Sequence, residues 1–98
     1  MIRIGFMSKI EKEIVVMNKK GLHARPAALF VQLADKFDVS VSVAKGAEKV
    51  DGKSIMGLLM LGAQYQAHLL VSIDGADAQR AMDAIEMFFA KQEEELTP

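Results

Sequence analysis

A lone histidine, basic side chains and a turn-forming glycine occur together at residues 18–26, which read Asn-Lys-Lys-Gly-Leu-His-Ala-Arg-Pro. An Ile- and Val-rich run at residues 10–17 precedes this stretch and predicts a strand. Apolar residues at helical spacing follow it and predict a helix. His23 therefore lies where a strand gives way to a helix, and we expect the chemistry of the chain there.

The helix is expected to begin near Ala24, so that His23 is its N-cap or an immediate neighbour. Pro26 supports this start, because the N–H that proline lacks would have no intrahelical partner in the first turn. The unpaired N–H groups and the positive dipole end at a helix start bind anions. The same dipole end favours a neutral imidazole, which keeps the lone pair that a nucleophile needs.

Arg25 adds a planar guanidinium that suits phosphate oxygens. If His23 accepted a phosphoryl group, Arg25 and the nearby N–H groups would hold the negative charge of the product. The residues thus predict a phosphoryl acceptor at His23. On the residues alone, a histidine that caps the helix and does nothing else is an equal alternative.

Two blocks of the sequence resemble one known family. Residues 21–27, Gly-Leu-His-Ala-Arg-Pro-Ala, resemble the active-site signature of HPr, the histidine phosphocarrier family of the bacterial phosphoenolpyruvate-dependent sugar phosphotransferase system. Residues 53–57, Lys-Ser-Ile-Met-Gly, followed by Leu61 and Gly62, resemble that family's regulatory serine region. The resemblance covers about residues 9–91.

This resemblance implies a phosphohistidine at Nδ1 of His23. The phosphoryl group would come from phosphoenolpyruvate through enzyme I and would pass to a sugar-specific enzyme IIA. The backbone N–H groups of Ala24 and Arg25 would receive the phosphate, and the Arg25 side chain would stabilise it. The resemblance implies a carrier without independent turnover and without a cofactor, whose partners supply Mg²⁺ and positioning. A carrier of the nitrogen-related, regulatory branch is an alternative, which the accepting enzyme IIA would distinguish.

Ser54 is expected to be the N-cap of a second, short helix that ends near Leu61 and Gly62. Capping alone accounts for a serine at that position. The resemblance implies, in addition, that the ATP-dependent HPr kinase/phosphorylase phosphorylates Ser54, and a phosphate is electrostatically favoured at a helix N-terminus. A second alternative function follows, in which the chain is a regulatory binding module whose phospho-Ser54 docks onto a catabolite-control transcription factor.

The second helix is apolar nearly all round, whereas a small two-layer domain can bury only one of its faces. We therefore expect some of its apolar side chains to be exposed. The resemblance implies that Ile55, Met56 and Leu59 form the patch that meets enzyme I and enzyme IIA, where methionine adapts to different partners. Ordinary core packing is the alternative for each of these side chains.

Hydrophobic periodicity predicts the remaining elements and their order, β-α-β-β-α-β-α. The predicted strands lie at residues 10–17, 39–43, 47–51 and 67–73, and the predicted helices at residues 24–36, 54–61 and 77–91. This order predicts an α+β fold in which helices cover one face of a four-stranded antiparallel sheet. The HPr resemblance implies the same architecture, a two-layer open-faced β-sandwich.

Length and composition predict a single domain over residues 1–98, of which 51% are apolar. Residues 1–8 are expected to form an N-terminal extension. Residues 92–98 are expected to fray, because three glutamates beyond the last helix oppose its dipole. The net charge is −1, which argues against non-specific nucleic-acid binding, and a small RNA-binding domain is the most distant alternative.

No cysteine, targeting segment or apolar run of membrane-spanning length occurs in the sequence, so we expect a cytoplasmic monomer without membrane insertion. We expect no metal site, because His68 has no second ligand at metal-binding spacing. Residues 52–54, Gly-Lys-Ser, lack the remainder of a phosphate-binding loop, so ATP binding is not expected. The basic cluster of Lys19, Lys20 and Arg25 either steers an acidic partner or is simply solvated.

Overall fold

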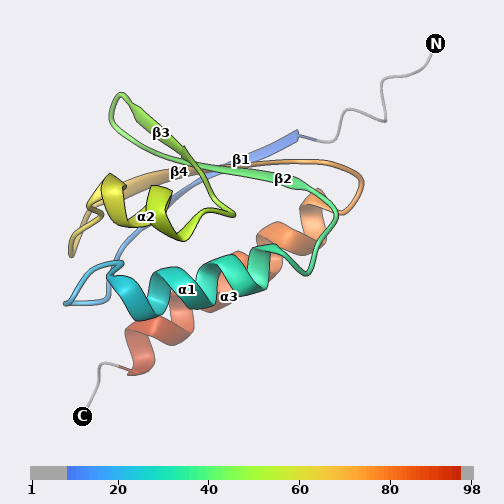
Figure 1. Ribbon diagram of the computed structural model, residues 1–98. Coiled ribbons are helices and arrows are strands. Elements are labelled where there is room, and N and C mark those ends of the chain that lie inside the picture. Colours follow the sequence, from blue (N-terminus) through green and yellow to red (C-terminus); the bar gives the residue numbers. More distant parts are fainter. Residues whose placement is uncertain (1–8, 96–98) are drawn as a thin grey trace.

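The computed structural model describes residues 9–95, which fold in the predicted order β-α-β-β-α-β-α (Figure 1). The elements are β1 (Lys9–Val15), α1 (Ala24–Ala34), β2 (Ser40–Lys45), β3 (Glu48–Asp51), α2 (Ile55–Leu61), β4 (His68–Asp74) and α3 (Ala78–Glu95). The predicted α+β fold class is confirmed.

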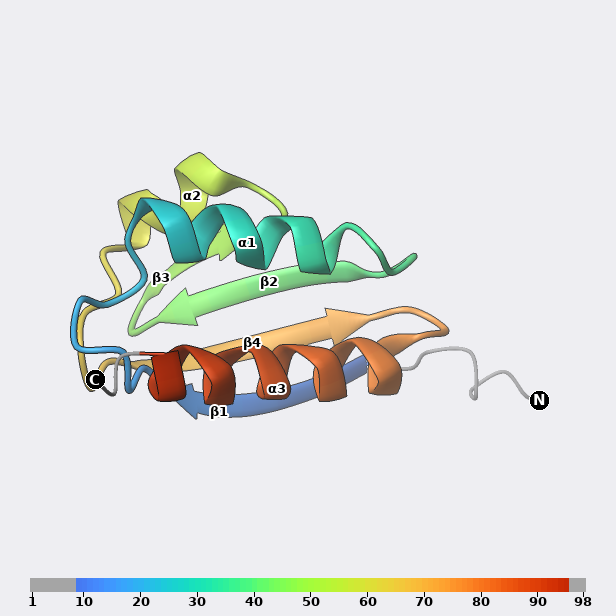
Figure 2. The same cartoon turned by 90° about the horizontal axis from the view of Figure 1, so that it is seen from below.

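The four strands form one sheet in the order β1-β4-β2-β3, and every neighbouring pair is antiparallel. The helices lie on one face of this sheet (Figure 1), and α1 and α3 run antiparallel to each other across it (Figure 2). Within residues 9–95, no helix covers the other face of the sheet. This is the two-layer arrangement that the sequence predicts.

The core lies between the sheet and the helices, because each strand turns alternate apolar side chains toward the helical layer. The largest side chains with less than 2% of their surface exposed are Val16, Phe30, Val43, Leu58, Leu69, Val71, Ile73, Met82 and Ile85. Burying a side chain of this size stabilises a fold by about 1.5–3 kcal/mol.

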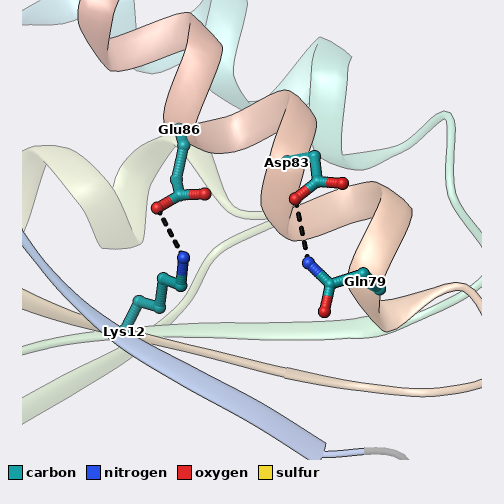
Figure 3. Close-up of polar contacts among 4 residues, drawn as sticks. All are labelled: Lys12, Gln79, Asp83 and Glu86. Atoms are coloured by element: carbon teal, nitrogen blue, oxygen red, sulfur yellow. Dashed lines mark hydrogen bonds and ion pairs between the residues drawn. The ribbon is translucent and has the colours of Figure 1, made fainter.

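An ion pair also attaches α3 to the edge strand. Lys12 Nζ of β1 donates to Glu86 Oε2 of α3 at 2.9 Å, and one turn earlier Gln79 donates to Asp83 within α3 (Figure 3). Glu86 therefore contacts β1, whereas Asp83 contacts a neighbour on α3 itself.

Two predicted helix ends were wrong. Helix α1 ends at Ala34 and not at residue 36, because the chain tightens there into turns in which Lys36 N donates to Leu33 O and Phe37 N donates to Ala34 O. Helix α3 continues to Glu95, beyond the predicted end at residue 91. The fraying expected for residues 92–98 stays a prediction. A tertiary contact of Gln92, described below, stabilises this last part of α3.

The predictions for residues 1–8 and 96–98 fall outside the described residues. Within residues 9–95, no helix is both long enough and apolar enough to cross a membrane.

Candidate functional site

The loop between β1 and α1 is organised by Asn18, which is 7% exposed. Its Oδ1 accepts a hydrogen bond from Lys20 N at 2.9 Å, and its carbonyl oxygen accepts one from Gly21 N at 2.8 Å. Its Nδ2 donates to Gln92 Oε1 at 3.2 Å, and Gln92 is also buried. The tight turn before His23 is thus linked to the end of α3.

Gly21 and Leu22, which directly precede His23, pack against the loop between α2 and β4. Leu22 N donates to Ala63 O at 2.8 Å, and the Leu22 side chain is buried. Gly21 has φ +72°, and a Cβ at this position would lie 2.6 Å from Ala63 O. Only glycine combines this φ with so close an approach to a neighbouring backbone. The position of His23 is therefore fixed from two sides, by α3 through Asn18 and by the loop after α2.

His23 is the N-cap residue of α1, with φ −84° and ψ −168°, as the sequence predicts. Its carbonyl oxygen accepts the first helical hydrogen bond, from Ala27 N at 2.9 Å, but its side chain makes no capping hydrogen bond. The imidazole is exposed instead. A histidine that serves only as a cap would direct its ring at the first-turn N–H groups, so this geometry disfavours the capping role as the sole role of His23.

The first turn of α1 leaves donors free for an anion. Among residues 9–95, neither Ala24 N nor Arg25 N donates to a backbone carbonyl, and Pro26 has no N–H to donate. Pro26 is buried, as are Ala27 and Phe30 behind it, so the helix start is held firmly against the core. The result is an exposed pair of N–H groups at the positive end of the helix dipole.

A shallow pocket of about 280 Å³ brings the ring and the cations together. His23, Arg25 and Lys20 line it, and Asn18, Pro26, Leu29 and Gln92 complete the wall. No acidic side chain lines this pocket among residues 9–92, whose side chains the structure describes. Its electrostatics therefore favour a dianionic group such as a phosphoryl group on the imidazole.

Of the predicted basic cluster, Lys20 and Arg25 line the pocket, whereas Lys19 is exposed outside it. Asn18 and Gln92 are the parts of the site that sequence reasoning missed. An asparagine before a glycine turn is a recognisable signal for an Asx turn, but its partner Gln92 is 74 residues away in the chain and carries no local signal.

Ser54 is the N-cap of α2, as predicted, and its Oγ accepts a hydrogen bond from Gly57 N at 2.9 Å. Gly62 ends this helix in the left-handed conformation, with φ +66°. Ser54 does not line the His23 pocket. It is instead the C-terminal side of α2, through Ala63, that contacts the loop before His23.

The apolar side chains of α2 divide into two sets, as the sequence predicts. Leu58 and Leu61 are buried in the core. The three predicted patch residues are exposed, by 42% for Ile55, 66% for Met56 and 38% for Leu59, and Met60 is exposed by 75%. The spacing of these four residues places them on one side of α2, and α2 packs against α1.

His68 is exposed on β4, and its Nδ1 lies 3.3 Å from Glu13 Oε2 of β1. No group of three or more histidine, cysteine or acidic side chains in residues 9–95 is arranged to hold a metal ion. The two histidines of the chain thus differ: His68 lies beside a carboxylate on the sheet, whereas His23 lies among cations at a helix start.

Comparison with known proteins gives consistent matches. The family model of the PTS HPr component phosphorylation site matches residues 10–91. The HPr-like protein Crh of Halalkalibacterium halodurans is 42% identical over 83 residues, which are 85% of this chain and 99% of that protein. The phosphocarrier protein HPr of Treponema pallidum is 38% identical over 86 residues, which are 88% of this chain and 98% of that protein.

The fold gives the same result. The crystal structure of HPr-C-His from Thermoanaerobacter tengcongensis has a TM-score of 0.82 and 42% identity, and the match covers 86% of this chain and 94% of that chain. The family match spans all seven helices and strands, apart from Lys9 of β1 and the last four residues of α3. The chain belongs to the HPr family of the phosphotransferase system.

Proposed function

We propose that the chain is a phosphocarrier that accepts a phosphoryl group on His23 from phospho-enzyme I and passes it to an enzyme IIA of the sugar phosphotransferase system. One observation carries this proposal: the exposed His23 ring makes no capping bond and lies in a cationic pocket beside two free N–H groups. This arrangement suits an anion that is bound to the ring and must later leave it.

In the forward step, a lone pair of the neutral imidazole attacks phosphorus, a new N–P bond forms, and the bond from phosphorus to enzyme I breaks. We assign the attack to Nδ1, by family resemblance. The N–H groups of Ala24 and Arg25 and the Arg25 guanidinium hold the phosphoryl oxygens. In the second step, enzyme IIA attacks the phosphorus on His23, and the N–P bond breaks. The chain is then back in its starting form and has carried the group without turnover of its own. The partners supply Mg²⁺ and alignment of the reacting atoms.

The test is intact mass after incubation of the chain with phosphoenolpyruvate, Mg²⁺ and catalytic enzyme I. We expect a gain of one phosphoryl group that acid removes and that is absent from His23→Ala. His68→Ala is the matched control and should gain the group normally. A gain that persists in His23→Ala, or no gain by the wild-type chain with an enzyme I that phosphorylates another carrier, contradicts the proposal.

We further propose that Ser54 is a regulatory phosphorylation site for the HPr kinase/phosphorylase, with Ile55, Met56 and Leu59 as the apolar patch that docks enzyme I and enzyme IIA. The capping position of Ser54 supports this, because a phosphate there faces the positive end of α2. Phosphate beside the patch would place negative charge on a surface that partners must cover. A regulatory module that presents phospho-Ser54 to a catabolite-control transcription factor is compatible with the same geometry.

Two substitutions separate the cap from the charge. Ser54→Asp keeps an acceptor for Gly57 N and adds negative charge, so we expect near-normal stability but slower phosphorylation of His23. Ser54→Ala removes the cap without adding charge, so it should cost about 1 kcal/mol of stability and leave the phosphorylation rate nearly unchanged. Equal rates for Ser54→Asp and wild type would contradict regulation by charge at this position.

A further inference from the structure

A second depression lies on the helical layer, between α1 and α3. Its volume is about 390 Å³, and it is lined by three residues of α1, by Lys36 in the turn after α1 and by five residues of α3, namely Leu29, Gln32, Leu33, Lys36, Ala84, Met87, Phe88, Lys91 and Gln92. We call it the α1–α3 groove. Its side chains recur at helical spacing on both helices, so the groove runs along the direction of the antiparallel helix pair (Figure 2).

The floor of this groove is rigid and apolar. Phe88 packs edge-to-face with Phe30 at 5.8 Å and with Phe89 at 5.3 Å between ring centroids. Above this floor, Met87 is 61% exposed and Leu29 is 39% exposed. A fixed aromatic base with an adaptable methionine at its rim is a combination suited to binding an apolar side chain of another molecule.

The two charged side chains that line the groove in the described part of the chain are both lysines. Lys36 follows the C-terminal end of α1, and Lys91 lies near the C-terminal end of α3. Because the two helices are antiparallel, one lysine lies at each end of the groove (Figure 2). Among the residues whose side chains the structure describes, which end at Gln92, no acidic side chain lines it. Of the α3 carboxylates with described side chains, Glu86 pairs with Lys12, and Asp83 accepts a hydrogen bond from the neutral amide of Gln79 (Figure 3). A segment that fills the groove must therefore be apolar in its middle and acidic near its ends.

The groove is also continuous with the His23 pocket, because Leu29 and Gln92 line both. Eight residues separate Ala84 from Gln92 on α3, which corresponds to about 12 Å along a helix axis. This length matches about two turns of a helix laid between α1 and α3, the geometry in which an amphipathic helix occupies an apolar groove.

We propose that the α1–α3 groove docks an amphipathic, acidic helix of a partner protein, on the side of α1 opposite α2. The site is separate from the exposed apolar surface of α2, so the two surfaces can be occupied by different partners or by two parts of one partner. The groove needs no phosphoryl group on His23, and its occupancy is measured on the unphosphorylated chain.

The probe is a synthetic peptide of about 12 residues, or about three helical turns, with leucines at helical spacing on one face and glutamates at both ends. The full chain carries methyl labels on its methionines and leucines for NMR. We expect saturable shifts of the Met87, Leu29 and Leu33 methyl signals, with the Met56 and Met60 signals unmoved. The same peptide with lysine in place of glutamate should bind at least tenfold more weakly.

Substitutions at exposed positions then locate the site without disturbing the core. Met87→Glu, and separately the pair Lys36→Glu with Lys91→Glu, should each weaken binding of the acidic peptide at least tenfold. Met60→Glu, which changes an exposed methionine of α2, should leave the affinity unchanged. Anionic phosphatidylserine vesicles form a second arm, and we expect no binding that depends on Met87.

Three results would overturn the proposal. The first is the absence of a saturable shift at millimolar peptide, or equal affinity for the acidic and basic peptides. The second is a set of shifts confined to the methionines of α2. The third is vesicle binding that Met87→Glu removes, which would assign the groove to a membrane surface and not to a protein helix.

Discussion

The guanidinium of Arg25 is exposed and forms no ion pair with a carboxylate in the described part of the chain. An unpaired arginine two residues from an exposed histidine is free to contact whatever the histidine carries. At the residue scale, this freedom distinguishes Arg25 from Arg80, which lies against Asp77 and the ring of Phe37. We therefore propose that Arg25 binds the phosphoryl group and does not stabilise the fold.

Arg25→Ala should slow phosphoryl transfer from enzyme I by about tenfold to a hundredfold, because a hydrogen bond to a charged group contributes about 1.5–3 kcal/mol. Arg25→Lys should recover part of the rate, since it keeps the charge but loses the planar fork. Rapid-quench kinetics measure both, and the free energy of unfolding should change by less than about 0.5 kcal/mol. A wild-type rate for Arg25→Ala would remove it from the site.

Sequence reasoning located His23 and Arg25 because their roles depend on neighbours in the chain. The helix start, the proline and the arginine all lie within three residues of the histidine. Asn18 lies in the same stretch, but its role depends on Gln92, which only the folded chain brings within 3.2 Å. The sequence therefore did not predict the role of a residue whose partner is distant in the chain.

At the scale of elements, the loop between β1 and α1 is the part on which the site most depends. It contains no regular structure, and its geometry is determined by a positive φ at Gly21 and by contacts to two other elements. Loops of this kind position functional side chains because the rigid elements around them define their ends.

Gly21→Ala should cost more than about 2 kcal/mol of unfolding free energy, because the positive φ is strained for alanine and its Cβ meets Ala63 O. Gly46 gives a matched control, since it has φ +61° but nothing within 4 Å of the position of a Cβ. Gly46→Ala should therefore cost only about 1 kcal/mol of strain. Urea unfolding compares the two, and equal costs would show that the contact with Ala63 is unimportant.

Helix α3 ends four residues beyond the predicted end at residue 91. Glutamates in a last helical turn oppose the dipole, but that effect contributes only about 0.3–1 kcal/mol for each charge. A buried hydrogen bond from Asn18 to Gln92 offsets it. Tertiary contacts therefore extended the helix beyond the end that its own sequence predicts.

At the scale of the whole molecule, the two faces of the sheet have different chemistry. One face is buried under three helices, and the open face carries charged and hydroxyl side chains. On that open face, Ser72 Oγ donates to Glu11 Oε2 at 2.8 Å. This hydrogen bond, together with the nearby ammonium groups of Lys9 and Lys49, lowers the pKa of Glu11 below its ordinary value of 4.5.

A lowered pKa in the folded state makes the ionised form of Glu11 favourable to folding. Its contribution is present above the unfolded-state pKa and is lost as the pH falls through the folded-state pKa. Ser72→Ala should raise the pKa of Glu11 toward 4.5, as followed by NMR titration of its carboxyl carbon. Ser42→Ala changes the cross-strand neighbour of Ser72 and should have little effect. An unchanged Glu11 titration in Ser72→Ala would contradict this cause.

The architecture was predictable from the sequence because alternation in the strands and helical spacing in the helices both direct apolar side chains to one layer. The groove between α1 and α3 was not predictable from the sequence. The groove depends on the distance between two helices that are far apart in the chain. The periodicity of apolar residues within one helix does not predict that distance.

The most direct test of the account uses the two histidines of the chain as signal and internal control. Long-range ¹H–¹⁵N NMR of the imidazoles is recorded before and after phosphorylation by phosphoenolpyruvate, Mg²⁺ and catalytic enzyme I. The account predicts that only the His23 ring changes, with phosphorus bonded to Nδ1, and that His68 keeps its signals beside Glu13. A shift of the His68 ring in place of His23, or phosphorylation that leaves both rings unchanged, would contradict His23 as the phosphoryl acceptor.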